Sequence, residues 1–219
     1  MKLKKFLNDF SQINTFKNIA QKSPQITKNF KFVYILIVLI WILGTYANFS
    51  ELKFSLDFYS LGVRFGRFAL ILLGIVVLPG ILGRFGLEIP ITRVITLFRR
   101  QLGITVFLLA FTHYSFVRLL PILSNSYKLK LPPPYFEIAG FWALTFLFLM
   151  FITSNNFAIG KMGMWWKRLH RIVYVVLWLL VLHTGLQRIS IFSVFIFFFA
   201  TLEVFSWIIY FFKSKSVNN

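Results

Sequence analysis

Long apolar runs constrain this chain more than any other feature of its sequence. Six segments of the 219 residues carry at most one charged side chain each, and they are close to the 20 or so residues that a helix needs to cross a bilayer. Only 14% of all residues are charged, against about 25% in a typical soluble domain. The sequence therefore predicts an all-α integral membrane protein, a six-transmembrane-helix bundle. The predicted spans are 32–49, 66–83, 102–123, 136–153, 172–187 and 190–212.

Proline and glycine mark the points where these spans are expected to bend or end. The second span contains Pro79 and four glycines, which predicts a kink or a break. Three prolines at 132–134 indicate a loop between the third and fourth spans. An interfacial turn near Trp165 is expected just before the fifth span.

The lysine and arginine residues are distributed unequally between the two ends of the predicted bundle. Seventeen of the 24 fall in the leader, the second and fourth connections and the tail, and the other seven fall on the opposite side. Loops rich in Lys and Arg stay in the cytoplasm, so we expect both termini to be cytoplasmic. The net charge of +18 forms no solvated stripe, so no nucleic-acid partner is expected.

The charge pattern divides the chain into three parts. We expect a basic amphipathic cytoplasmic leader at 1–31, the transmembrane bundle at 32–212 and a short cytoplasmic tail at 213–219. Apolar residues recur at helical spacing among the lysines of the leader, which favours a helix lying on the lipid surface; a frayed basic tail is the alternative. These residues are Leu3, Phe6, Leu7, Phe10 and Ile13.

Two chemical absences narrow the choice of cofactor. The chain has no cysteine, which excludes disulfides, thiolate metal sites and covalent haem attachment. It also has no glycine-rich nucleotide loop, so we expect no flavin or nicotinamide domain within the chain.

Two of the three histidines lie at nearly the same predicted depth in the membrane. His113 is 13 residues beyond Arg100 and His183 is 12 residues beyond Arg171, which places them about 20 Å and about 18 Å from the cytoplasmic face. Two neutral imidazoles that face each other can supply both axial ligands of a haem iron. The alternative is that each histidine hydrogen-bonds a neighbouring helix or faces a wet cavity.

His170 lies at the cytoplasmic boundary and cannot share an iron with His183. Thirteen helical residues separate the two, which corresponds to about 20 Å of rise and roughly 140° of rotation. Any metal site that uses His170 must therefore be a second site.

Three motifs together resemble the ferric-reductase-like transmembrane domain. They are the run RRQLGI at 99–104 that leads to His113, the run WKRLHRIVY at 166–174, and the pair Leu182-His183. The resemblance covers about residues 60–212. Within the family, the motifs are most similar to the haem-binding membrane subunits of bacterial periplasmic methionine-sulfoxide reductase systems.

This resemblance implies a membrane b-type cytochrome of the bacterial cytoplasmic (inner) membrane, the electron-transfer subunit of an oxidoreductase. Haem b would lie between the third and fifth spans, with His113 and His183 as axial ligands. The electron donor would be a cytoplasmic flavin reductase, which would bring the flavin, or a quinol. The acceptor would be a periplasmic reductase or a ferric chelate. A non-haem transporter or an assembly or anchor protein is the alternative function.

The resemblance leaves the number of haems open, at one or two. His170 matches a family histidine near the inner face, where two-haem relatives bind a second haem. Those relatives have two histidines in the third span, whereas this chain has only His113 there. The stretch VVLPGILGRFG at 76–86 also departs from the expected subunit pattern.

Three charged residues in the predicted spans are further candidates. Arg67 and Arg118 lie nearest the proposed haem depth, where a guanidinium can pair with a haem propionate; ordinary snorkelling to the interface is the alternative. Glu203 falls in the sixth span, where it would relay protons, contact a quinol, or pair with a histidine or an arginine. A neutral, hydrogen-bonded carboxylic acid is the alternative for Glu203.

Overall fold

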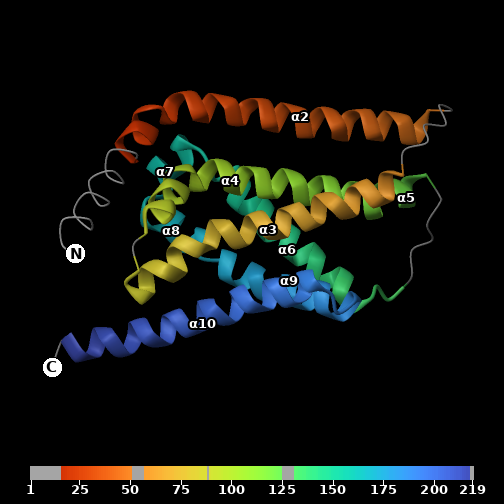
Figure 1. Ribbon diagram of the computed structural model, residues 1–219. Helices are drawn as coiled ribbons and strands as arrows, with labels where there is room; N and C mark the ends of the chain where they lie inside the picture. The colour runs from red at the N-terminus through yellow and green to blue at the C-terminus, as the bar shows by residue number, and fades with distance from the viewer. Residues whose placement is uncertain (1–15, 51–56, 88, 125–130, 218–219) are drawn as a thin grey trace.

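The computed structural model describes residues 16–50, 57–87, 89–124 and 131–217, and these residues form a bundle of long helices (Figure 1). Within the described residues there is no strand, and six helical segments are long and apolar enough to cross a membrane. This confirms the predicted fold class. The helices are α2 (Ser23–Phe49), α3 (Phe58–Phe85), α4 (Pro90–Tyr114), the π-helical η1 (Ser115–Leu119), α5 (Leu120–Leu123), α6 (Tyr135–Ile152), α7 (Asn156–Met162), α8 (Met164–His170), α9 (Val173–Gln187) and α10 (Ile191–Val217).

Local sequence explains where several helices begin and end. Asp57 caps α3 by accepting a hydrogen bond from the Ser60 backbone N–H at 3.1 Å, and this bond holds the pKa of the Asp57 carboxyl below its ordinary value. The same helix ends at Gly86, whose φ of 80° is left-handed. Pro90 then occupies the first turn of α4, where its missing N–H is harmless.

Two expectations about the helices need correction or extension. Pro79 does not break the second span, because α3 runs without interruption through it. Prolines are tolerated in membrane helices when the surrounding protein satisfies the freed carbonyl. The first long helix begins at Ser23, nine residues before the apolar run, and so includes Lys28 and Lys31. The amphipathic pattern predicted in the leader lies in residues 1–15, outside the described residues.

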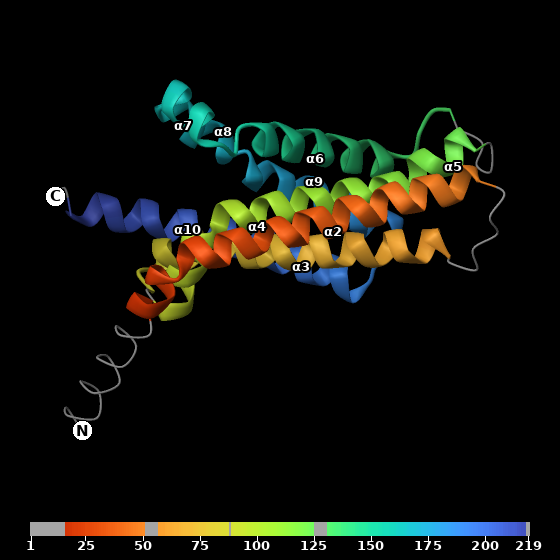
Figure 2. The same cartoon turned by 90° about the horizontal axis from the view of Figure 1, so that it is seen from above.

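The bundle is built from two antiparallel helix pairs. Helix α3 packs against α4, α6 packs against α9, and α10 packs against one helix of each pair, α3 and α9. Helix α2 lies along α4 (Figure 2). The beginning of α2 and the end of α10 lie at the same end of the bundle, while α5 lies at the other (Figure 1). The short α8 precedes α9, as the expected turn near Trp165 requires.

Apolar side chains occupy both the interior and the exterior of the bundle. Leu73, Val77, Val176, Leu177 and Ile196 are almost fully buried between the two helix pairs and α10. Many large apolar side chains are nevertheless exposed on every long helix. A soluble protein rarely exposes so much apolar surface, whereas a bilayer solvates it. The protein is therefore a multi-pass membrane protein.

Arg84 joins three helices through a buried polar network. Its Nε donates to Ser206 Oγ at 2.8 Å, its Nη1 donates to the Tyr174 hydroxyl at 2.9 Å, and its Nη2 lies 3.3 Å from Glu203 Oε1. The guanidinium also lies over the rings of Tyr174 and Trp207, at 5.1 and 4.7 Å from their centres. Of the roles considered for Glu203, the structure shows pairing with an arginine, which fastens α10 to α3.

Replacing Glu203 with leucine should destabilise the protein by about 3 kcal/mol, because an unpaired guanidinium would remain buried. The combined variant Arg84→Met/Glu203→Leu should lose less than the sum of the two single variants, because it removes both charges. Thermal unfolding of the detergent-solubilised protein measures this coupling. Thr201→Val is the control, because Thr201 lies on the same helix and bonds only within it, to the Phe197 carbonyl. A stability equal to that of the control would contradict the assignment.

Candidate functional site

Two histidine rings from different helix pairs meet inside the bundle. His113 near the end of α4 and His183 in α9 have ring centres 6.4 Å apart, and their planes are inclined by 77°. Both side chains are half-buried. The structure thus brings together the two imidazoles that the depth estimate placed at the same level.

Backbone carbonyls fix one nitrogen of each ring. His113 Nδ1 lies 2.9 Å from the Gly62 carbonyl oxygen on α3, and His183 Nδ1 lies 2.8 Å from the Phe136 carbonyl oxygen on α6. A carbonyl can only accept, so each Nδ1 carries the hydrogen and each neutral ring presents a lone pair at Nε2. Hydrogen bonding to neighbouring helices was the alternative role considered for these histidines. The structure shows such bonds, and they leave both Nε2 atoms available to a ligand.

Glycines make room for both rings on the facing helices. A Cβ atom added at Gly66 would lie 2.8 Å from His113 Nδ1, and one added at Gly140 would lie 2.6 Å from His183 Nδ1. Both distances are shorter than a van der Waals contact. The two carbonyls and two glycines were not identified from the sequence, because they depend on how neighbouring helices are aligned.

The distance between the two ring centres is close to that expected for two imidazoles that bind one metal ion from opposite sides. Metal–imidazole bonds of about 2 Å, together with the radii of two rings, would place the ring centres roughly 6 Å apart. Among the described residues no cluster of three or more His, Asp or Glu side chains could complete a metal site. The two histidines would therefore suit a metal-containing cofactor that brings the remaining metal ligands with it.

His170 has a different environment. One ring nitrogen, Nε2, lies 3.2 Å from Thr153 Oγ1, and the ring stacks on Trp166 with 4.1 Å between centres. Trp166 Nε1 in turn donates to the Thr153 carbonyl at 2.9 Å. The other two histidines of the chain form the pair described above, so His170 has no histidine left to pair with.

The two candidate arginines lie in contrasting settings. Arg118, in η1, forms an ion pair with Glu137 of α6, the residue directly after the carbonyl that holds His183. Arg67, next to Gly66, is exposed, and its guanidinium lies 5.2 Å from the centre of the Phe192 ring of α10. Arg118 is therefore tied to the histidine site through α6, and Arg67 is turned toward α10.

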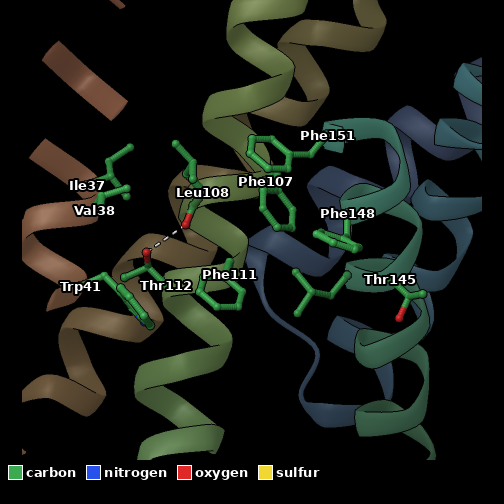
Figure 3. A pocket seen from close by; sticks show the side chains of 11 residues that line it. Ile37, Val38, Trp41, Phe107, Leu108, Phe111, Thr112, Thr145, Phe148 and Phe151 are labelled. Atoms are coloured by element: carbon green, nitrogen blue, oxygen red, sulfur yellow. Dashed lines mark hydrogen bonds between the residues drawn. The ribbon is translucent and has the colours of Figure 1, made fainter. Parts of the chain in front are cut away.

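A cavity of about 450 Å³ lies elsewhere, between α2, α4 and α6 (Figure 3). Aromatic side chains dominate its lining, including Trp41 on α2 and Phe107 on α4. The hydroxyls of Thr112 and Thr145, which also line it, bond to carbonyls of their own helices. None of the three histidines lines the cavity. It offers an apolar surface suited to hydrocarbon and no titratable group.

The fold and the histidine pair define a class of protein: a membrane-spanning helical bundle with two adjacent imidazoles from different helix pairs. Residues 65–181, more than half of the chain, match the family model described as ferric reductase like transmembrane component. The chain therefore belongs to this family. The match includes Gly66, His113 and Gly140, begins three residues after Gly62 and ends two residues before His183.

One relative gives a more particular comparison. Over 110 residues the chain is 34% identical to a protein of Agrobacterium fabrum named protein-methionine-sulfoxide reductase heme-binding subunit MsrQ. The alignment covers 49% of this chain and 51% of that relative, so the chain spans about half the length of the curated relative. No solved structure matches the chain.

A chemical cross-link can test the histidine geometry without any cofactor. The chain has no cysteine, so the variant His113→Cys/His183→Cys would contain one pair of thiols. A membrane-permeant bismaleimide that spans slightly more than the 6.4 Å between the ring centres should join them within one chain. Intact mass would show one added reagent and no free thiol. His113→Cys/His170→Cys is the matched control, and equal cross-linking in both variants would contradict the placement.

Proposed function

We propose that this protein is a membrane cytochrome subunit that binds one b-type haem between His113 and His183 and conducts electrons across the bilayer. The observation that carries the proposal is the pair of neighbouring imidazoles, whose ring centres lie 6.4 Å apart and whose Nδ1 atoms are each bonded to a backbone carbonyl. Membership of the ferric-reductase-like family supports it, as does the similarity to a heme-binding subunit. The two protein ligands match the number of axial positions on a haem iron.

The protein residues would determine how the haem behaves. A bound haem would supply a one-electron carrier. The carbonyls of Gly62 and Phe136 hold the Nδ1 hydrogens, which fixes the tautomer and makes each Nε2 a stronger ligand. With His113 and His183 both holding it, a bound haem would serve electron transfer and would leave no place on the iron for a substrate.

The expected orientation determines the side of the membrane on which the donor and the acceptor lie, and the family resemblance suggests what they are. With the Lys-rich and Arg-rich face in the cytoplasm of a bacterial inner membrane, the donor is a cytoplasmic flavin reductase carrying its own flavin, or a quinol in the bilayer. The acceptor is a periplasmic reductase or a ferric chelate on the outer side, and the name of the relative favours a methionine-sulfoxide reductase. Arg118 and Arg67 are the residues we propose nearest the haem propionates.

One haem is the expected number. The histidine count allows one bis-histidine site, and His170 is occupied by Thr153 and Trp166 instead. A second haem would need a ligand other than histidine opposite His170. We therefore assign a structural role to His170, the last residue of α8, because its contact with Thr153 connects this helix to the end of α6.

Haem reconstitution tests the axial assignment. The wild-type protein should give the low-spin spectrum of a bis-imidazole haem, and His113→Gly and His183→Gly should each lose it because one axial nitrogen is missing. Free imidazole should restore the spectrum in both variants, which distinguishes a lost ligand from misfolding. A wild-type spectrum in either variant without imidazole would reject the assignment. A protein that stays colourless, with no response to dithionite, would favour the transporter or anchor alternative.

The haem content of the purified protein tests the number of sites. A pyridine haemochrome assay, divided by the protein concentration, should give about one haem per chain, because the chain supplies one pair of imidazoles. His170→Ala should keep both that ratio and the low-spin spectrum. Two haems per chain, falling to one in His170→Ala, would show that His170 is a ligand after all.

A further inference from the structure

Both histidines contact their neighbouring helices in the same register. His113 bonds to the carbonyl of Gly62 and lies against Gly66, four residues later on α3. His183 bonds to the carbonyl of Phe136 and lies against Gly140, again four residues later, on α6. The two halves of the bundle therefore use one arrangement: a carbonyl at one position and a glycine one turn further along.

Helix geometry explains why a glycine is needed at this position. The Cα–Cβ bond of a helical residue points back toward the N-terminus of its helix, so the side chain covers the preceding turn. A side chain at position 66 or 140 would cover the carbonyl of residue 62 or 136, which the imidazole must reach. An added Cβ would lie 2.8 Å and 2.6 Å from the two Nδ1 atoms. Even a methyl group is too large at both positions.

We propose that Gly66 and Gly140 are positioning residues of the haem site, which let each imidazole reach its carbonyl and thereby aim Nε2 at the iron. This inference rests on the proposed function. In the haem-free protein a histidine can rotate away from an added methyl group. In the loaded protein it cannot, because the iron, the hydrogen bond and the backbone all constrain the same ring. The cost of a methyl group should therefore appear in haem binding.

The chain contains matched controls for this inference. An added Cβ at Gly103, on the same helix as His113, would meet no atom within 4 Å. The same is true of Gly185, on the same helix as His183. Gly74 also packs tightly, but against Phe195 of α10 and not against a histidine. The close contact with imidazole therefore distinguishes Gly66 and Gly140 from glycines that are merely helical.

The experiment measures haem binding and the spectrum in four glycine-to-alanine variants. Gly66→Ala and Gly140→Ala should weaken haem binding by about 10-fold to 100-fold, the usual cost of losing a hydrogen bond that orients a metal-bound histidine. Gly140→Ala should be the weaker binder, because its methyl group lies closer to the ring. Both should also change the low-spin electron paramagnetic resonance signal. Gly103→Ala and Gly185→Ala should match the wild type in both measurements.

An experiment with free imidazole separates positioning of the histidine from a general effect on folding. In the background His183→Gly with free imidazole, the added ring can shift away from a methyl group, so Gly140→Ala should no longer weaken haem binding. A penalty that persists there, or haem binding equal to the wild type in both Gly66→Ala and Gly140→Ala, would overturn the inference. Wild-type protein that binds no haem would instead overturn the proposed function.

Discussion

The hydrogen bond between an imidazole and a backbone carbonyl, made inside hydrocarbon, is the interaction on which the site depends. A polar ring buried in a membrane is costly unless its N–H finds an acceptor. His113 and His183 solve this with carbonyls of α3 and α6, at 2.9 and 2.8 Å. The same bond that makes each ring tolerable in the membrane also determines which nitrogen is left for a ligand. Each Nδ1–carbonyl hydrogen bond therefore both stabilises the buried ring and selects Nε2 as the nitrogen that can bind a ligand.

Much of the architecture could be predicted from hydrophobicity alone. The six spans are present because each apolar run must satisfy its own backbone in lipid, which leaves a helix as the only solution. The approach of His113 to His183 followed from counting residues beyond the basic cluster at each helix entrance. The start of α2 at Ser23 was missed, because a helix can continue into polar solvent where apolar periodicity gives no signal.

The parts that could not be predicted depend on contacts between helices. Gly66 was interpreted as a cause of bending, yet it provides space for the ring of His113. Glu203 had several candidate partners, and only the packing of α10 on α3 selects Arg84. Pro79 was expected to disturb its helix but does not interrupt it. Sequence spacing describes one helix at a time, whereas each of these outcomes requires the rotation and height of a second helix.

The packing of α10 has a mechanical consequence. This helix contains no histidine, yet it connects the α3–α4 pair to the α6–α9 pair by packing against one helix of each. Its polar contact with Arg84 is made at the last turn of α3, and that end of α3 lies away from α5 (Figure 1). Because α10 contacts both α3 and α9, a shift of this helix would act on both helix pairs, and so on the separation of His113 and His183. Contact with the exposed outer side of α10 would therefore act on both histidines indirectly, without touching either ring.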